Sequence, residues 1–348
     1  MRYEMGRHSR TFIYWIFLLL LIVIPVSVVI REVCGQEIRQ KDDETIKLGT
    51  TLVQVPVVVS DFGGRYITDL KENNFSVYED GVKQQIGYFG SIEEPFSAAL
   101  LLDSSGSTQA QLAVIKQAAQ AFVESLRPQD RVMIIVFNDS VEILCELTSD
   151  KQIMNKAIES IKAGEFTQVY EAVYTAVWEK LQDVTGRKAL IMFTDGIDTA
   201  SSEISQEDTL DAVVESEDVI VYPIRFSTRA DVERKLESRR SAAAGERVGM
   251  TVAKSSDYLL ELDRTYRQAD EYLFELAKLS GGVVERADRI TDLKSAFNRI
   301  ANELRHQYII GYYPANKDKE NRVRKINIQV DRPDVRVRFR PGYRNLDQ

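Results

Sequence analysis

Residues 98–107 read Ala-Ala-Leu-Leu-Leu-Asp-Ser-Ser-Gly-Ser, an apolar run followed directly by a polar loop. Its first half is a short apolar run, which is typical of a strand buried on both faces of a parallel sheet. Apolar residues then recur at helical spacing until Arg127-Pro128 stops the helix: Leu112, Ile115, Ala119, Phe122 and Leu126. The stretch and its sequel therefore predict one strand-helix unit.

Three further apolar runs have the same character, at residues 132–137, 189–194 and 219–224. Strands that alternate with helices predict an α/β fold, a Rossmann-like doubly wound sheet. Such sheets bind ligands beyond the carboxyl ends of their strands. The polar residues that directly follow each run are therefore the candidates for a functional site.

Oxygen-bearing side chains follow two of these runs. Asp103, Ser105 and Ser107 come after the first, and Asp195 follows Thr194 at the end of a later one. Two carboxylates that face each other in a buried crevice repel, and desolvation makes each charge costly unless a cation lies between them. A hard divalent ion such as Mg²⁺ accepts a mixed set of hydroxyl and carboxylate oxygens. The pattern predicts a divalent metal site.

The same residues resemble the metal-ion-dependent adhesion site of von Willebrand factor A domains. The matching motifs are Asp103-x-Ser105-x-Ser107, Thr167 in the loop 164–167, and Thr194-Asp195-Gly196, although Phe166 stands where family members commonly have glycine. The resemblance covers residues 96–306 and implies a von Willebrand factor A-like domain with Mg²⁺ or Mn²⁺ as its ion. It further implies that an Asp or Glu of a protein partner completes the metal shell. The implied ligands are Asp103, Ser105, Ser107, Thr167 and Asp195.

Each of these features has a simpler interpretation. An isolated Asp-x-Ser-x-Ser motif often caps the start of a helix without any metal. Asp198 is either a further oxygen ligand or a solvated turn residue, and we expect the turn. The charged stretch 229–247 is expected to be a solvated helix and loop, with contact to a partner as the alternative.

The two flanks of the domain are rich in strand patterns. Residues 36–95 form a β-rich amino-terminal segment with candidate strands at 52–60, 75–78 and 82–89, and residues 307–348 carry three more, at 308–313, 323–330 and 335–339. Neither flank is long enough for a core of its own, so we expect both to close into one small β-sandwich-like unit. Motifs at 69–81 and 304–314 resemble those of exported bacterial proteins with a VWFA-related domain.

Composition and the amino terminus limit the setting in which the protein works. The chain has 348 residues and a net charge of −8, which disfavours nucleic acid as a partner. A charge-free apolar stretch at 11–30 follows several basic residues, so residues 1–35 are expected to be a signal peptide cleaved before Gln36 or a retained membrane anchor. Either outcome places the protein outside the cytoplasm, in the periplasm, secreted or anchored facing outward. A membrane contact is expected only through such an anchor.

Three classes of function fit these observations to different degrees. We expect a metal-dependent binding module of the adhesion type, and the alternative is a structural scaffold whose metal site is vestigial or only ties loops together. We do not expect an enzyme, because a serine nucleophile needs a base and His306 is remote in sequence from the crevice loops. Cys34 and Cys145 allow at most one disulfide and no cysteine zinc site.

Overall fold

The computed structural model describes residues 52–90, 94–216, 218–234, 238, 253–287, 292–316 and 323–344. Contacts gather residues 50–348 into one compact unit. The expected signal peptide or anchor, residues 1–35, lies outside the described residues. Among the helices that are described, none combines the length and the apolarity needed to cross a membrane.

A six-stranded sheet lies at the centre of the chain, with the strand order β10-β9-β8-β5-β6-β7. The strands pair in parallel except for β7, which runs antiparallel at one edge. The strand bounds are β5 Phe96–Asp103, β6 Arg131–Phe137, β7 Val141–Thr148, β8 Arg187–Thr194, β9 Val219–Arg225 and β10 Glu285–Arg286. Each apolar run of the sequence is thus a strand, and the doubly wound prediction is confirmed.

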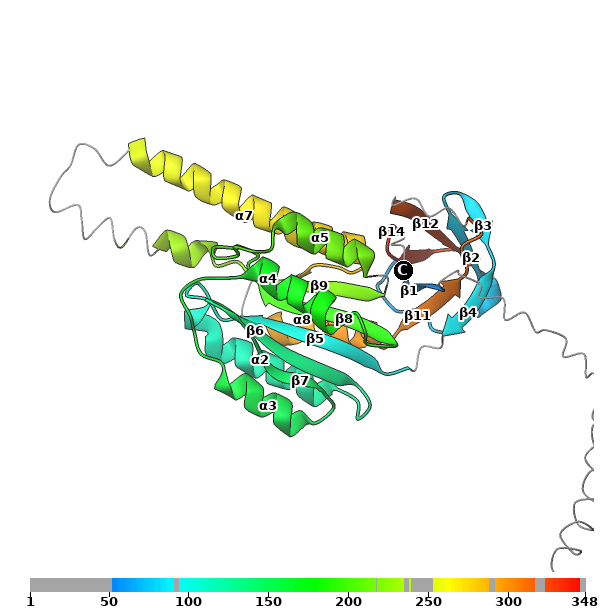
Figure 1. Cartoon of the computed structure of the whole chain (residues 1–348), viewed down its shortest axis with the longest axis horizontal. Helices are drawn as coiled ribbons and strands as arrows, with labels where there is room; N and C mark the ends of the chain where they lie inside the picture. Colours follow the sequence, from blue (N-terminus) through cyan, green and yellow to red (C-terminus); the bar gives the residue numbers. More distant parts are fainter. Residues whose placement is uncertain are drawn as a thin grey trace, which may run out of the picture. The chain divides into compact units, whose positions relative to one another are not determined.

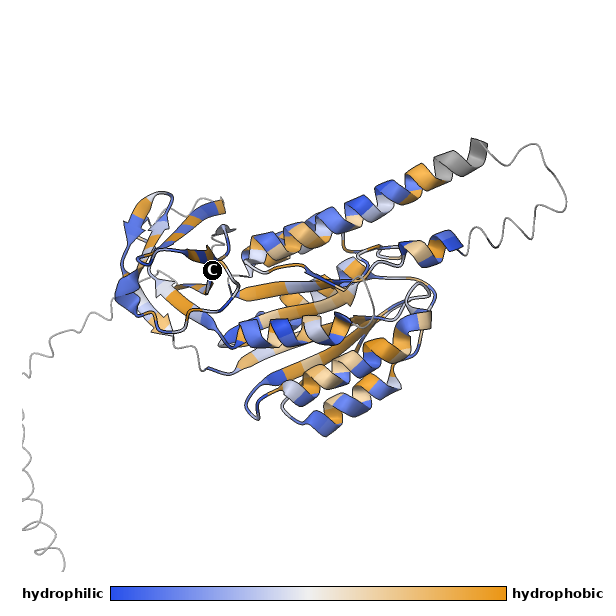
Figure 2. Cartoon of the chain, turned by 180° about the vertical axis from the view of Figure 1, so that it is seen from behind, coloured by the Kyte–Doolittle hydropathy of each residue, from blue (hydrophilic) through white to orange (hydrophobic). Residues whose placement is uncertain are grey.

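Helices cover both faces of this sheet because successive residues of β5 point to opposite sides. Leu100 and Leu102 pack in a core under α2 (Leu112–Ser125), α3 (Lys151–Ser160) and α8 (Leu293–Leu304). Leu101 packs in a second core under α4 (Val169–Tyr174), the π-helical segment η3 (Thr175–Lys180), α5 (Gln206–Glu215) and α7 (Ala253–Ser280). Figure 1 shows this layering, and Figure 2 shows the apolar strands between helices with polar outer surfaces.

The flanks build two four-stranded sheets, ordered β13-β1-β11-β4 and β14-β12-β2-β3. Both sheets combine strands from the two flanks. The amino-terminal strands are β1 Val53–Asp61, β2 Phe75–Glu79, β3 Val82–Gln84 and β4 Ile86–Gly90. The carboxyl-terminal strands are β11 Gln307–Tyr312, β12 Val323–Val330, β13 Val335–Arg338 and β14 Gly342–Arg344. Short 3₁₀ segments occur at η1 (Glu72–Asn74) and η2 (Gln109–Gln111).

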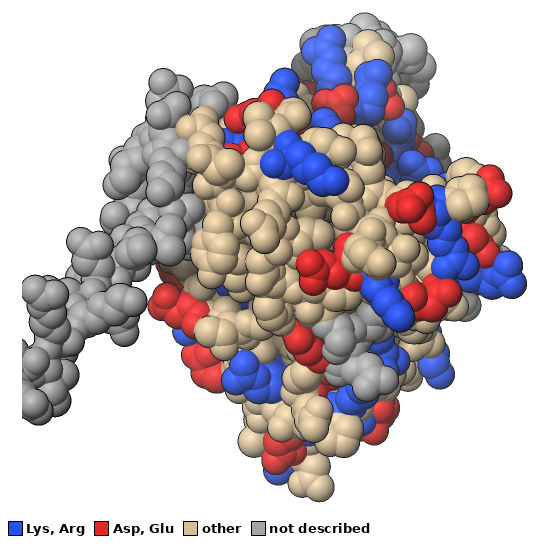
Figure 3. Space-filling view, turned by 90° about the vertical axis from the view of Figure 1, so that its right-hand side faces the viewer, with Lys and Arg blue, Asp and Glu red and all other residues tan. Residues whose placement is uncertain are grey.

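The two small sheets share one apolar core, which includes Val55, Val77, Ile310 and Ile328. Val55 and Val77 come from one flank and the two isoleucines from the other, so neither flank completes the core by itself. The prediction of a small β-sandwich-like unit built from both flanks is confirmed. Figure 3 views the side of the molecule that carries β2, β3 and β4, where a broad area lacks charged side chains.

Buried arginines join the sandwich to the central domain. Arg340, 1% exposed, donates to the carbonyls of Val214 at 2.7 Å and Ser216 at 2.8 Å, where α5 ends. Arg187, at the start of β8, donates to the carbonyl of Gln307 at 2.8 Å. These bonds cross the expected border at 306/307, and the borders at 95/96 and 306/307 remain predictions from the sequence.

Candidate metal site

Asp103 ends the central strand β5 and is fully buried. One carboxylate oxygen accepts a hydrogen bond from the backbone N–H of Ser105 at 3.0 Å. The other oxygen accepts a hydrogen bond from the hydroxyl of Thr194 at 2.8 Å. Thr194 is the last residue of the neighbouring strand β8. The strand pairing therefore brings the two predicted parts of the site together, although they lie 91 residues apart in the sequence.

Asp195, which directly follows β8, faces the same crevice and is 4% exposed. Its Oδ1 accepts from the backbone N–H of Ile197 at 3.1 Å, and its Oδ2 lies 3.5 Å from the Ser107 hydroxyl. The hydroxyls of Ser105 and Ser107 lie 3.0 Å apart. Four of the five predicted side chains are thus linked in one cluster of oxygen atoms.

Thr167 comes from the loop between α3 and α4 and is 5% exposed. Its backbone N–H donates to the hydroxyl of Thr199 at 2.9 Å. Two glycines let this loop pack closely against the Asp103 loop and against the end of β6. A Cβ at Gly106 would lie 3.1 Å from the Glu165 carbonyl oxygen, and one at Gly164 would lie 2.7 Å from the Asn138 Cβ. The contact at Gly106 places the loop that carries Thr167 next to the loop that carries Ser105 and Ser107.

A cavity of about 370 Å³ opens at this cluster. Three of the predicted residues line it, namely Ser107, Thr167 and Asp195. Asp103 and Ser105 are not among the lining residues but connect to them through the hydrogen bonds given above. The structure therefore brings all five sequence-predicted residues together at the carboxyl ends of β5 and β8.

Sequence reasoning missed two further residues of the site. The Thr228 hydroxyl donates to Asp195 Oδ2 at 2.5 Å and contacts the Tyr266 hydroxyl at 2.7 Å. Thr228 follows strand β9, so the strand-end rule that selected Asp103 and Asp195 also applies to it. Tyr266 lies on α7, and no local pattern points from that helix to the crevice.

Asp198 has a structural role. Its carboxylate accepts from the backbone N–H of Val169 at 2.7 Å, at the start of α4, and from the Ser201 hydroxyl at 2.5 Å. These bonds fix the start of the helix and the turn 198–201. The geometry agrees with the interpretation of Asp198 as a turn residue.

The two central carboxylates are electrostatically strained without a cation. Burial, followed by the nearby charge of Asp195, raises the pKa of Asp103 to about 7. Burial likewise raises the pKa of Asp195, against the lowering effect of the Thr228 and Ile197 hydrogen bonds. A cation between the two groups would remove this penalty.

The donor chemistry of the site fits a hard divalent ion. All five side chains offer oxygen, and two of them are carboxylates, which suits Mg²⁺ or Mn²⁺ better than a soft metal. Within the described parts of the chain, no cluster of three or more His, Cys, Asp or Glu side chains offers another place for a metal. Asp103, Ser105, Ser107, Thr167 and Asp195 are the residues that would hold the ion.

The central part of the chain is a von Willebrand factor type A domain. Residues 98–197 match the family model described as "von Willebrand factor type A domain", and the chain contains such a domain. The recognition made from the sequence motifs is confirmed at the level of the domain.

Individual relatives are distant or partial. An uncharacterised protein of Synechocystis is 31% identical over 109 residues, which is 29% of this chain and 25% of that protein. The chain therefore matches about a quarter of the length of that relative. A von Willebrand factor type A structure from Catenulispora acidiphila is 10% identical, covers 80% of this chain and 75% of that one, and has a TM-score of 0.45. The structure of proximal thread matrix protein 1 from the mussel byssus, with a zinc-occupied MIDAS motif, is 13% identical to this chain. The match covers 66% of this chain and 50% of that one, with a TM-score of 0.45.

Proposed function

We propose that this protein is a divalent-metal-dependent binding module that works outside the cytoplasm and holds a protein partner through one of the partner's Asp or Glu residues. The observation that carries the proposal is the convergence of five oxygen-bearing side chains beside a cavity that three of them line, with the pKa of Asp103 raised to about 7 by burial and by Asp195. The five side chains would hold an Mg²⁺ or Mn²⁺ ion, which would neutralise both aspartates and would bind a carboxylate of the partner. The apolar stretch at 11–30 supports export.

One observation favours a structural scaffold as the second candidate. Thr194 already bonds to Asp103, and Thr228 already bonds to Asp195, so hydroxyls alone connect the three strand ends. In that case the site ties loops together and an ion adds stability without any partner. The two candidates differ in whether binding to a partner needs the metal.

The contacts of His306 support a function other than catalysis. Its ring stacks on Tyr66 at 5.1 Å between centroids, and its Nδ1 lies 2.6 Å from the carbonyl oxygen of Asn302. The ring is therefore engaged at the end of α8 rather than at the serines of the crevice. We propose that the protein is not an enzyme.

The proposed function is tested by binding of the purified protein to intact cells of its source. We expect binding with Mg²⁺, loss of binding with EDTA, and loss in the variant Asp103→Asn. Asp183→Asn, which alters an exposed aspartate outside the site, serves as the control and should bind like the wild type. Amidation of the cell-surface carboxyl groups should also abolish binding. Binding that persists in EDTA would refute the adhesion-type function.

A further inference from the structure

Asp195 is held by a residue that lies outside the von Willebrand motifs. Its Oδ2 accepts a hydrogen bond from the Thr228 hydroxyl at 2.5 Å. The backbone N–H of Ile197 donates to Oδ1 at a longer 3.1 Å, and the Ser107 hydroxyl donates to Oδ2 at 3.5 Å. The Thr228 hydroxyl therefore holds the carboxylate more closely than these two groups do.

The hydroxyls of Thr228 and Tyr266 form a chain that leads from α7 to this carboxylate. They lie 2.7 Å apart, and either oxygen could donate by distance alone. An ionised carboxylate only accepts hydrogen bonds, so Thr228 donates its single hydroxyl proton to Asp195. Tyr266 must then donate to Thr228. Because the bonds of such a chain polarise one another, the Tyr266 hydroxyl strengthens the contact between Thr228 and Asp195.

The chain of hydroxyls is shielded from water. Thr228 is fully buried, and Tyr266 is only 4% exposed. A hydrogen bond in such a setting is stronger than in water, and solvent does not replace a partner that is lost. The backbone of Thr228 is also fixed, because its carbonyl accepts from the N–H groups of Asp231 at 2.9 Å and Val232 at 3.1 Å.

Helix α7 forms a second wall of the cavity at the metal site, and two contacts fix this wall on either side of Tyr266. Before it along the helix, Asp263 pairs with Arg229 at 2.8 Å, next to Thr228 in the sequence. After it, Leu273 is fully buried, and a Cβ at Gly196 would lie 3.0 Å from its side chain. The α7 residues that line the cavity are Glu261, Leu262, Thr265 and Tyr266.

A residue that hydrogen-bonds to a metal ligand orients that ligand, and its loss typically lowers metal affinity about 10- to 100-fold. We propose that Thr228 and Tyr266 are positioning residues of the metal site, which set the affinity for the ion through Asp195. Neither residue is among the ligands that the von Willebrand motifs imply. This inference rests on the proposed function and adds to it a role for α7 in holding the site ready for the ion.

Calorimetric titration of the full chain with Mg²⁺ tests the inference. We expect Thr228→Val to bind Mg²⁺ roughly tenfold or more weakly than the wild type, and Thr228→Ser, which keeps the hydroxyl, to bind within about threefold of it. Wild-type affinity in Thr228→Val, or equal losses in both variants, would overturn the inference and leave the proposed function intact. A wild type that does not bind Mg²⁺ would overturn both.

Tyr266→Phe tests the second hydroxyl of the chain. The variant keeps the ring, and we expect a smaller loss of Mg²⁺ affinity, roughly threefold, because Thr228 still donates to Asp195. The same change in Thr228→Val should cause no further loss, since the chain is already broken there. An unchanged affinity in Tyr266→Phe, or a further loss in the double variant, would overturn the route from α7 through Thr228.

Tyr272→Phe separates positioning from general damage to α7. Its hydroxyl is also buried on this helix and lies 2.9 Å from the Thr209 hydroxyl, away from the metal site. Urea denaturation should show a loss of stability similar to that of Tyr266→Phe, because each variant removes one buried hydroxyl. Its Mg²⁺ affinity should stay within about twofold of the wild type. A loss of affinity as large as in Tyr266→Phe would overturn the proposal.

Discussion

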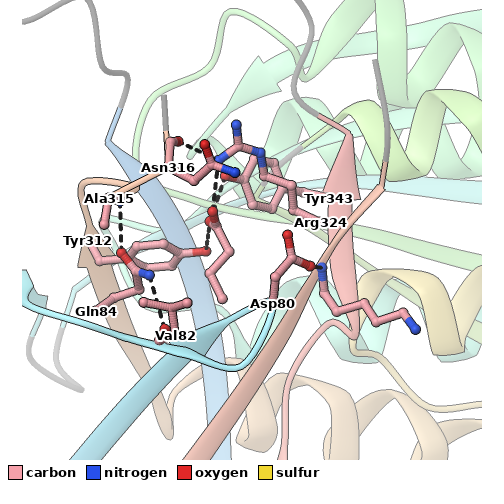
Figure 4. Close-up of polar contacts among 10 residues, drawn as sticks. Asp80, Val82, Gln84, Tyr312, Ala315, Asn316, Arg324 and Tyr343 are labelled. Carbon is pink, nitrogen blue, oxygen red and sulfur yellow. Dashed lines mark hydrogen bonds and ion pairs between the residues drawn. The ribbon is translucent and has the colours of Figure 1, made fainter. Parts of the chain in front are cut away.

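The carboxylate of Glu79 and the guanidinium of Arg324 lie 2.7 Å apart inside the β-sandwich, and each side chain is only 1% exposed. Glu79 ends β2 in the amino-terminal flank and Arg324 lies on β12 in the carboxyl-terminal flank, 245 residues later. The hydroxyls of Tyr312 and Tyr343 donate to the same carboxylate at 2.8 Å each. Figure 4 shows Arg324 and the two tyrosines converging on this point. The network therefore holds the two flanks together.

Removing one partner of this ion pair should destabilise the whole sandwich. We expect Arg324→Met to lower the free energy of unfolding by about 3–5 kcal/mol, because it leaves a buried carboxylate without its cation. The double variant Glu79→Gln/Arg324→Met should lower the free energy of unfolding by less, because neither buried charge of the pair remains. Urea denaturation measures both. As a control, Arg332→Met removes an exposed pair with Asp69 and should cost about 0–1 kcal/mol.

Asp103→Asn should remove the stabilising effect of divalent metal. With Mg²⁺ at about a hundred times its dissociation constant, the wild type should gain roughly 2.7 kcal/mol, or a rise in Tm of roughly 5–10 °C. Asn keeps the shape of the side chain and removes one of two repelling charges, so the metal-free variant should be at least as stable as the wild type. Thermal melts with EDTA and with Mg²⁺ measure both effects. A less stable metal-free variant, with no metal response in either protein, would show that Asp103 only caps the following loop.

Thr228→Val should lower the free energy of unfolding, because Thr228, which follows β9, forms a buried hydrogen bond with Asp195. The variant keeps the shape of the side chain but removes the hydroxyl that donates to Asp195 and accepts from Tyr266. Loss of a buried hydrogen bond to a charged group should cost about 1–3 kcal/mol, measured by chemical denaturation. Thr265→Val, whose hydroxyl donates to the Glu261 carbonyl of its own helix, should change stability by less than about 0.5 kcal/mol. Equal effects of the two variants would contradict a specific role for Thr228.

Gly164→Ala should displace the loop that carries Thr167. A Cβ at this position would lie 2.7 Å from the Asn138 Cβ, so the loop or the strand end must move. We expect Mg²⁺ affinity, measured by calorimetry, to fall by about tenfold or more, because metal ligands tolerate displacements of only a few tenths of an ångström. The neighbouring change Ala163→Ser serves as the control. Unchanged affinity in Gly164→Ala would remove Thr167 from the ligand set.

Arg340→Met should weaken the junction between the sandwich and the central domain. Arg340 donates to the carbonyls of Val214, Ser216 and Gly342, and its replacement leaves buried acceptors at the end of α5. We expect a loss of roughly 3 kcal/mol or more in the free energy of unfolding. Arg336→Met is the control, since that residue lies over the exposed ring of Phe62 and should cost about 1 kcal/mol at most. A loss no greater than in the control would show that the junction is weak.

Local patterns in the sequence determined the central sheet. The run expected at 98–102 is part of β5 (Phe96–Asp103), and the helix expected to stop at Arg127-Pro128 is α2, which ends at Ser125. These elements were predictable because burial on both faces of a sheet requires a continuous apolar run, and a helix on its surface requires apolar spacing near 3.6 residues. The strand-end rule then located Asp103 and Asp195.

Contacts between distant residues needed the tertiary structure. No local pattern pairs Glu79 with Arg324, or directs Tyr266 of α7 toward Thr228 and Asp195. Such contacts depend on strand register and on the path of a helix across the sheet, both of which are set by packing over the whole chain. The sequence alone therefore determined the type of fold and the oxygen atoms of the site. Only the folded chain decided that α7 forms a second wall beside them, because that wall is held by side chains far apart in the sequence.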